Sequence, residues 1–133
     1  MHHMLLLLIL LASRPVLGCD PDRIQSMNTA SEEQLKALVT CLASPDSELR
    51  DKFAYTQLAE ILRDQRPPAE QLEFLTVQLN EVLRQPDPVG VARPFYILVL
   101  AEIARTDRID AWMRPAQRQD LVDIAADYLE SVS

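Results

Sequence analysis

Glycine and histidine are scarce in this chain of 133 residues, which has 2 glycines and 2 histidines. Both histidines, His2 and His3, lie in the first three positions. The rest of the chain therefore cannot build a histidine-based triad, a histidine zinc site or the usual near-neutral general base. A sheet-rich domain with many tight turns usually needs more glycine. The sequence has no glycine-rich phosphate loop or nucleophile elbow, and we predict no cofactor and no metal site.

Basic residues are in the minority, with 13 Lys and Arg against 20 Asp and Glu and a formal net charge of −7. A nucleic-acid-binding surface needs a cationic face, so we predict no nucleic-acid partner, although a local basic patch is compatible with this balance. Hydrophobic residues make up 48% and charged residues 25%, which is typical of one globular domain. Abundant Leu, Ala, Glu, Gln and Arg favour helices.

The chain opens with an apolar run from Met4 to Ala12, and a short exit leads to Val16-Leu17-Gly18-Cys19. The run is too short for a membrane span, which needs about 20 apolar residues, and it matches the core of a secretory signal. Its ending resembles the bacterial lipobox, in which an obligatory cysteine follows a small residue. The resemblance implies that residues 1–18 are a signal peptide and that Cys19 becomes the lipid-modified first residue of the mature protein.

A lipid on Cys19 would anchor the protein to a membrane of the bacterial cell envelope, exposed outside the cytoplasm. Ordinary signal-peptidase cleavage is the alternative, because Val16 and Gly18 also suit that enzyme, and it gives a soluble periplasmic or secreted protein. Without lipid, Cys19 can form a disulfide with Cys41 in an oxidising compartment. With lipid, Cys41 is left alone, and its place in a helical pattern predicts a small buried apolar role.

Residues 19–30 show weak periodicity and are predicted to be a tether with room for one helical turn, and residues 31–133 to be a helical domain. Apolar residues at helical spacing predict about five helices there. We expect them from Ser31, with a Ser31–Gln34 capping box, from an N-cap at Ser44, from Pro68 to Leu83, from Arg93 to Ala104, and from Pro115 onwards. The helix from Arg93 is apolar nearly all round, so it should be the buried centre, with Leu98 and Leu100 among the most buried residues.

Short connections between these helices predict an all-α fold of antiparallel hairpins stacked side by side, as in a fragment of an α-solenoid. A compact helical bundle is the alternative. The stripe on the last helix is wide enough for two neighbours, and one of them is lacking. We therefore predict an interaction edge for self-association or for an envelope protein partner, formed by Leu121, Ile124, Tyr128 and Leu129.

Three segments, residues 44–55, 93–102 and 121–133, resemble an uncharacterised bacterial domain family of HEAT-like helical architecture. The first begins Ser44-Pro45-Asp46, continues through Arg50-Asp51 and ends at Tyr55. The resemblance implies a stacked helical fold and no established activity. Family members continue beyond the last helix into further sequence, so the chain reads as a version truncated at its C-terminus.

Two hypotheses about function follow. The first is an exported, non-catalytic helical-repeat module that binds another protein, with Asp46, Arg50, Asp51, Tyr55 and Arg93 as a loop clamp or surface feature. The alternative is a hydrolase-like enzyme that uses these same residues. Helix capping and dipole effects account for the carboxylates at this helix start, so we favour the non-catalytic hypothesis and assign no catalytic residue.

Lipid attachment is directly testable. We expect metabolic labelling with a fatty acid to mark the wild-type protein and not Cys19→Ala, because the thioether forms on the cysteine sulfur. Equal labelling of the two proteins would contradict lipidation at this residue.

Overall fold

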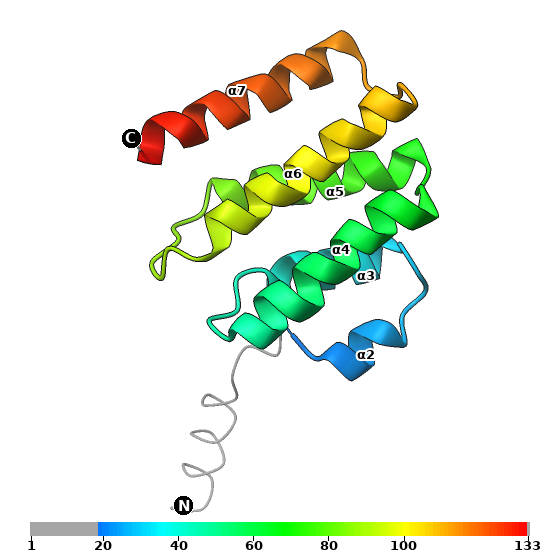
Figure 1. The fold of residues 1–133 in the computed structure, drawn as a ribbon, viewed down its shortest axis with the longest axis vertical. Coiled ribbons are helices and arrows are strands. Elements are labelled where there is room, and N and C mark those ends of the chain that lie inside the picture. The colour runs from blue at the N-terminus through cyan, green and yellow to red at the C-terminus, as the bar shows by residue number, and fades with distance from the viewer. Residues whose placement is uncertain (1–18, 133) are drawn as a thin grey trace, which may run out of the picture.

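The computed structural model describes residues 19–132 as an all-helical domain of six helices, with no strand in that range. The predicted signal, residues 1–18, lies outside the described residues, as does Ser133. Figure 1 shows the helices stacked side by side along the longest axis, with α2 and α3 at one end and α7 at the other. No described helix combines the length and the apolar character needed to cross a membrane.

The stack begins with α2 (Pro21–Gln25) and α3 (Glu32–Cys41). The expected N-cap is confirmed, because the backbone N–H of Gln34 donates to Ser31 Oγ at 3.2 Å. The second half of the expected capping box is not formed, because the N–H of Ser31 donates to the carbonyl of Asn28 at 3.1 Å and the Gln34 side chain binds elsewhere. Its Oε1 accepts from the N–H of Ala30 at 2.8 Å, and its Nε2 donates to the carbonyl of Ile24 at 3.2 Å.

Residues 19–30 are packed on the domain, so the expectation of a tether is corrected. Ile24 is 2% exposed and belongs to the core. Gln34 holds the carbonyl of Ile24, and a disulfide joins Cys19 to Cys41 with their Cα atoms 4.9 Å apart. One buried side chain and one covalent bond fix this segment, although its sequence has no helical stripe.

The disulfide also bears on the two cysteines. Cys41 is fully buried, as expected, but it is bonded and not alone. A lipid on Cys19 and the Cys19–Cys41 disulfide exclude each other, because both use the same sulfur atom. The structure has the disulfide, which is the alternative that the sequence left open, and lipidation stays a prediction for the labelling experiment.

A single rod follows, made of η1 (Glu48–Tyr55), α4 (Thr56–Glu60) and η2 (Ile61–Gln65), in which π-helical segments flank one α-helical turn. It begins at Asp46, whose Oδ1 accepts from the N–H of Glu48 at 2.9 Å. The expected N-cap at Ser44 is therefore wrong. Ser44 Oγ accepts from Asp46 N–H at 3.2 Å and so shapes the turn before the cap.

The second half consists of α5 (Ala69–Leu83), α6 (Ala92–Ile109) and α7 (Pro115–Val132). Pro67 and Pro68 separate the rod from α5, as expected, since proline cannot continue a preceding helix. The start of α6 is held by Asp87, whose Oδ2 accepts from the N–H of Arg93 at 3.0 Å. The helix continues five residues past the expected Ala104, so the following loop is short and its Trp112 lies close to the helix end.

The core runs through the middle of the stack. Its fully buried large side chains are Leu35, Leu38, Leu42, Leu58, Ile61, Leu62, Leu75, Leu79 and Ile103. In α6 the expectation is half right, because Leu100 is 6% exposed but Leu98 is 44% exposed. Leu98 lies on the solvent side of α6, since Val99 and Ile103 face the core. An all-round apolar helix does not show which side its neighbours cover.

This difference gives a matched pair of variants. Leu100→Ala should lower the free energy of unfolding by about 2–5 kcal/mol, because it leaves a cavity in the core. Leu98→Ala should lower it by less than about 1 kcal/mol, because no comparable cavity forms at an exposed position. Urea unfolding measures both values. Equal losses would show that the two leucines are equally buried.

Candidate functional site

Three of the residues expected to form a loop clamp do gather. The Arg50 Nε donates to Asp51 Oδ1 at 2.7 Å, and its Nη1 donates to the carbonyl of Ser44 at 3.2 Å. The guanidinium lies 5.4 Å from the centre of the Phe95 ring, and the Tyr55 ring meets the same ring edge-on at 5.8 Å. Arg50 therefore joins the loop before η1 to α6 by a hydrogen bond and a cation–π contact.

The other two residues of the set have separate roles. Asp46 caps the start of the rod. Arg93 donates from Nη2 to the carbonyl of Gln85 at 3.2 Å, and its backbone is held by Asp87. The hydrogen bonds of both residues thus serve helix starts and loops. These contacts assemble no nucleophile with a base, and no group of three or more His, Cys, Asp or Glu in residues 19–132 could hold a metal ion.

Helix α7 is the least covered element, because none of its residues is buried. The expected interaction edge divides here into two parts. Leu121 and Ile124 pack against the core, and Tyr128 is half-buried beside them. Leu129, by contrast, is 63% exposed. The inward residues thus anchor α7, and the apolar side chains of α7 that are exposed to solvent lie on one flank.

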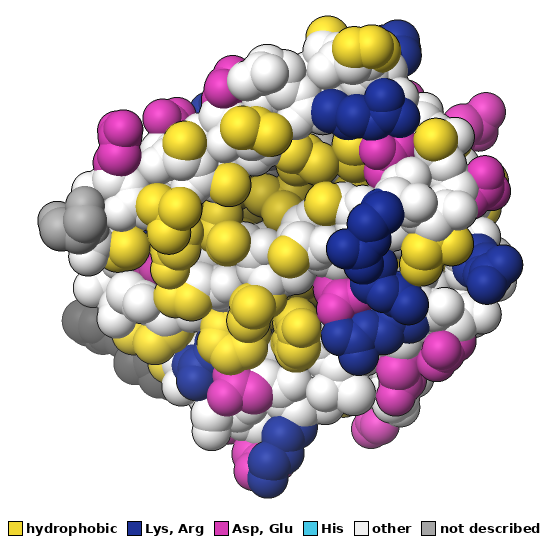
Figure 2. All heavy atoms as spheres, turned by 45° about the horizontal axis from the view of Figure 1, so that its top comes forward, with side chains coloured by type: hydrophobic (Ala, Val, Ile, Leu, Met, Phe, Trp, Pro, Cys, Tyr) yellow, Lys and Arg dark blue, Asp and Glu magenta, His cyan; other side chains and the backbone are white. Residues whose placement is uncertain are grey.

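That flank continues across α6. We define the α6–α7 face as the exposed or half-buried apolar residues on the solvent side of both helices. Figure 2 shows hydrophobic side chains gathered around a hollow there, with Lys and Arg side chains adjoining. Helical spacing places them on adjoining sides of the two helices. They are Ile97, Ala101 and Ala104 of α6 and Val122, Ala125 and Leu129 of α7.

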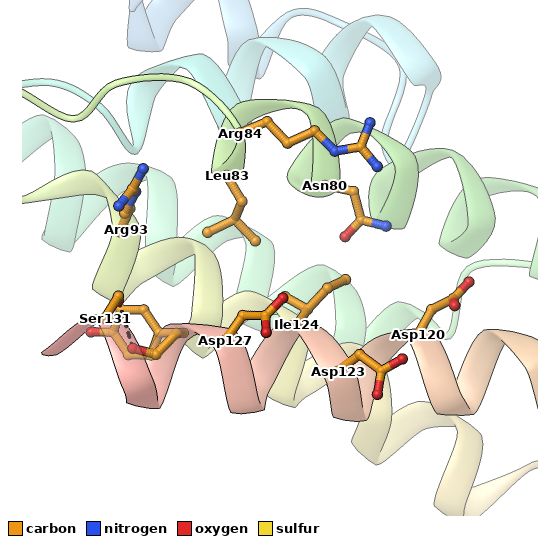
Figure 3. A pocket seen from close by; sticks show the side chains of 10 residues that line it. Asn80, Leu83, Arg84, Arg93, Asp120, Asp123, Ile124, Asp127 and Ser131 are labelled. Carbon is orange, nitrogen blue, oxygen red and sulfur yellow. Dashed lines mark hydrogen bonds between the residues drawn. The ribbon is translucent and has the colours of Figure 1, made fainter. Parts of the chain in front are cut away.

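The opposite flank of α7 is acidic. Asp120, Asp123 and Asp127 line a cavity of about 430 Å³ between α7, the end of α5 and the start of α6. Figure 3 shows these carboxylates on one side and Asn80 of α5 on the other. Asn80 Oδ1 and Arg93 Nε are buried there without a hydrogen-bond partner among the described residues. The flank towards α5 is thus polar, and the flank beside α6 is apolar.

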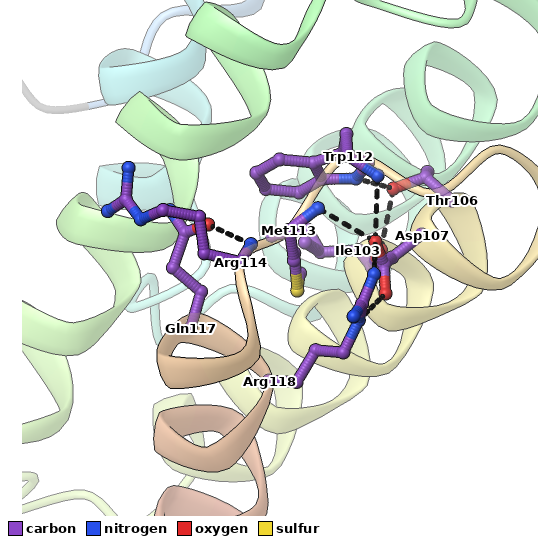
Figure 4. A network of polar contacts seen from close by, with 8 residues as sticks. All are labelled: Ile103, Thr106, Asp107, Trp112, Met113, Arg114, Gln117 and Arg118. Atoms are coloured by element: carbon purple, nitrogen blue, oxygen red, sulfur yellow. Dashed lines mark hydrogen bonds and ion pairs between the residues drawn. The ribbon is translucent and has the colours of Figure 1, made fainter.

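The angle between α6 and α7 depends on Asp107 (Figure 4). Its Oδ1 accepts from the N–H groups of Trp112 at 2.9 Å and Met113 at 2.8 Å, and its Oδ2 accepts from Arg118 Nε at 2.7 Å. Trp112 Nε1 in turn donates to Thr106 Oγ1 at 3.0 Å. One carboxylate therefore holds the end of α6, the turn and the first part of α7.

These contacts change the acidity of Asp107. The hydrogen bond from Arg118, followed by those from Met113 and Trp112, holds the pKa of the carboxyl far below its ordinary value, although partial burial acts in the opposite direction. The same contact raises the pKa of Arg118. Asp107 is thus charged in the folded protein at neutral pH, and a negative charge holds the turn.

Comparison with known proteins finds no matching family model, no similar curated protein and no similar solved structure. The evidence for function is therefore the geometry described above.

Neither Asp107 nor Trp112 is among the residues that the sequence predicts to form a site, and their network was not anticipated. A signal was present, because an aspartate near a helix end can accept from backbone N–H groups beyond it. The arginine partner lies 11 residues along the chain, however, and only the reversal of the chain brings it back.

Asp107→Asn should loosen α7. Loss of the charge removes the ion pair with Arg118 and weakens two backbone hydrogen bonds, which we expect to cost about 2 kcal/mol, or roughly thirtyfold in amide exchange rate. Hydrogen exchange of α7 amides at neutral pH measures this, with Asp110→Asn, at an exposed side chain, as the control.

The pH dependence has a definite sign. Because the folded pKa of Asp107 is lowered, its stabilisation is complete above the unfolded pKa of about 3.9 and is lost as the pH falls towards the folded value. The difference between wild type and Asp107→Asn should therefore shrink below about pH 4. A difference that is independent of pH would show that the charge is not what holds α7.

Proposed function

We propose that this protein is an exported, non-catalytic protein-interaction module that binds a helix of a partner on its α6–α7 face. The observation that carries the proposal is the exposure of this face. Val122 is 60% and Leu129 63% exposed on α7, and beside them α6 presents the half-buried Ile97 and the exposed Ala101 and Ala104. Exposed apolar patches of this kind mark interaction surfaces.

The occupant should be a helix, because of how the stack is built. Each helix buries its stripe between two neighbours, as α6 does between α5 and the rod. A helix laid along α6 and α7 would repeat that arrangement and cover both apolar sides. Amphipathic helices bind in this way, with apolar anchors at positions i, i+3, i+4 and i+7. This reasoning also supports the proposed membership of a HEAT-like helical family, whose hairpins stack in the same manner.

A partner of different sequence suits this face better than a second copy. From Pro115 to Val132, α7 carries one basic residue, Arg118, and four acidic ones, Asp120, Asp123, Asp127 and Glu130. Asp120, Asp123 and Asp127 lie on the flank towards α5 and not on the α6–α7 face, but the formal net charge of −7 would make two copies of the chain repel each other. A partner helix that carries Lys or Arg beside its apolar stripe would be attracted by this net charge instead.

Export is supported by the two cysteines. A disulfide persists in oxidising compartments and is rare in the cytosol, and Cys19–Cys41 uses both cysteines of the chain. We propose a location in the bacterial cell envelope, outside the cytoplasm. The soluble form would carry this disulfide, and a lipid-anchored form would carry a Cys41 thiol in its place.

A pair of synthetic helices tests the function. We expect a labelled amphipathic peptide of leucine and lysine to bind the mature protein in fluorescence anisotropy, and the same peptide with glutamate for lysine to bind far less. Leu129→Glu should weaken the binding about tenfold, because it puts a charge into the apolar contact.

The matched control is Val89→Glu. Val89 is 63% exposed, as Leu129 is, but it lies in the loop before α6, so this variant adds the same charge away from the face. Equal effects of the two variants would show that only net charge attracts the peptide. A dimer in sedimentation that Leu129→Glu dissociates would mean that the face binds a second copy, which contradicts a separate partner.

A further inference from the structure

A second cavity, of about 310 Å³, lies where the end of the rod and the start of α5 meet the end of α6. Three arginines line it, Arg63, Arg66 and Arg105, together with one acidic residue, Asp110. We call it the arginine pocket. It is separate from the α6–α7 face and shares no residue with it. In a chain with more acidic than basic residues, this local excess of positive charge stands out.

The side chains of two of the three arginines form no salt bridge. Arg63 is occupied, because it donates two hydrogen bonds to the carboxylate of Glu102. Within residues 19–132, the side chain of neither Arg66 nor Arg105 forms a hydrogen bond or a salt bridge, although Arg105 lies close enough to Glu102 to help lower the pKa of that carboxyl. Two guanidinium groups are thus available to an anion at the rim.

Part of the pocket wall is apolar and held firmly in place. Leu62 and Leu72 are 2% and 5% exposed, and Pro67 is buried beside them. Trp112 forms another wall, held in place by the bonds of its backbone to Asp107 and of its ring nitrogen to Thr106. A rigid apolar pocket with a few charged groups at its mouth is the usual form of a small-molecule site.

Arg66 occupies an unfavourable backbone position. Its φ is 45° and its ψ is 67°, in the left-handed region, at the C-cap of η2. Glycine is the residue that fits this conformation without strain. An arginine here carries a backbone cost that glycine would avoid. Replacing Arg66 by glycine therefore removes the side chain without straining the backbone.

We propose that the arginine pocket binds a small organic anion with an aromatic or aliphatic body. The anionic group would lie between Arg66 and Arg105, where charge-assisted hydrogen bonds are strongest. The body would lie against Leu62, Leu72 and Trp112. A carboxylate, sulfonate or phosphate ester of suitable size has this chemistry.

The chain carries its own reporter, because Trp112 is the single tryptophan. The probe is 8-anilinonaphthalene-1-sulfonate, an aromatic anion, and the matched uncharged probe is N-phenyl-1-naphthylamine. We expect the sulfonate to bind the mature protein, to quench Trp112 and to fluoresce through energy transfer from it. The uncharged probe should bind more weakly.

Arg66→Gly and Arg105→Gln should each weaken sulfonate binding about tenfold, since one charge-assisted hydrogen bond is lost, and leave the uncharged probe unaffected. Arg66→Gly should unfold at the same or a higher temperature, because it relieves the left-handed strain. The control is Arg84→Gln, in the cavity between α7 and the end of α5, and this variant should bind the sulfonate as the wild type does. Leu129→Glu should also bind as wild type, because the α6–α7 face lies outside the pocket.

Absence of sulfonate binding would overturn the proposal. So would equal affinity of wild type and both arginine variants, or binding that Leu129→Glu abolishes, which would place the probe on the α6–α7 face. Equal loss of both probes in the arginine variants would show that the arginines shape the pocket and do not bind the anion.

Discussion

The carboxylate of Asp107 ends one helix and orients the next, and the outer third of the molecule depends on it. Its two oxygens hold the N–H groups of Trp112 and Met113 and the guanidinium of Arg118. The position of α7, and so the shape of the α6–α7 face, follows from these bonds. The wall that Trp112 gives to the arginine pocket follows from them too. Two separate candidate sites thus share one half-buried polar anchor. Helix α7 needs such an anchor, because it buries no residue of its own.

Elsewhere the stack is held by contacts that cross from one hairpin to the next. Arg50 meets the Phe95 ring, and Arg63 binds Glu102 of α6 in a forked geometry. Glu102 is 9% exposed, and such a buried carboxylate requires a partner. These pairs specify which helices are neighbours, and the leucine core supplies most of the energy of burial. Specificity and stability therefore come from different residues.

The sequence was sufficient for the all-α fold and for most helix boundaries, because scarce glycine, helical spacing and the Pro67–Pro68 break are local signals. It was not sufficient for Leu98, since an all-round apolar helix leaves its covered side undetermined until neighbours are placed. The packing of residues 19–30 was not predicted, because one buried Ile24 leaves no periodic pattern and the disulfide was only one of two alternatives for Cys19. The arginine pocket needed the chain reversal that brings Arg66 and Arg105 together.

The Cys19–Cys41 bond gives the molecule a base and a tip. It fastens residue 19 to the end of α3, and Figure 1 places α2 and α3 at the opposite end of the longest axis from α7. A pull on residue 19 therefore acts on the base, where a covalent bond carries it directly into α3. Such a load would reach α3 before it strained the packing of α7 at the tip.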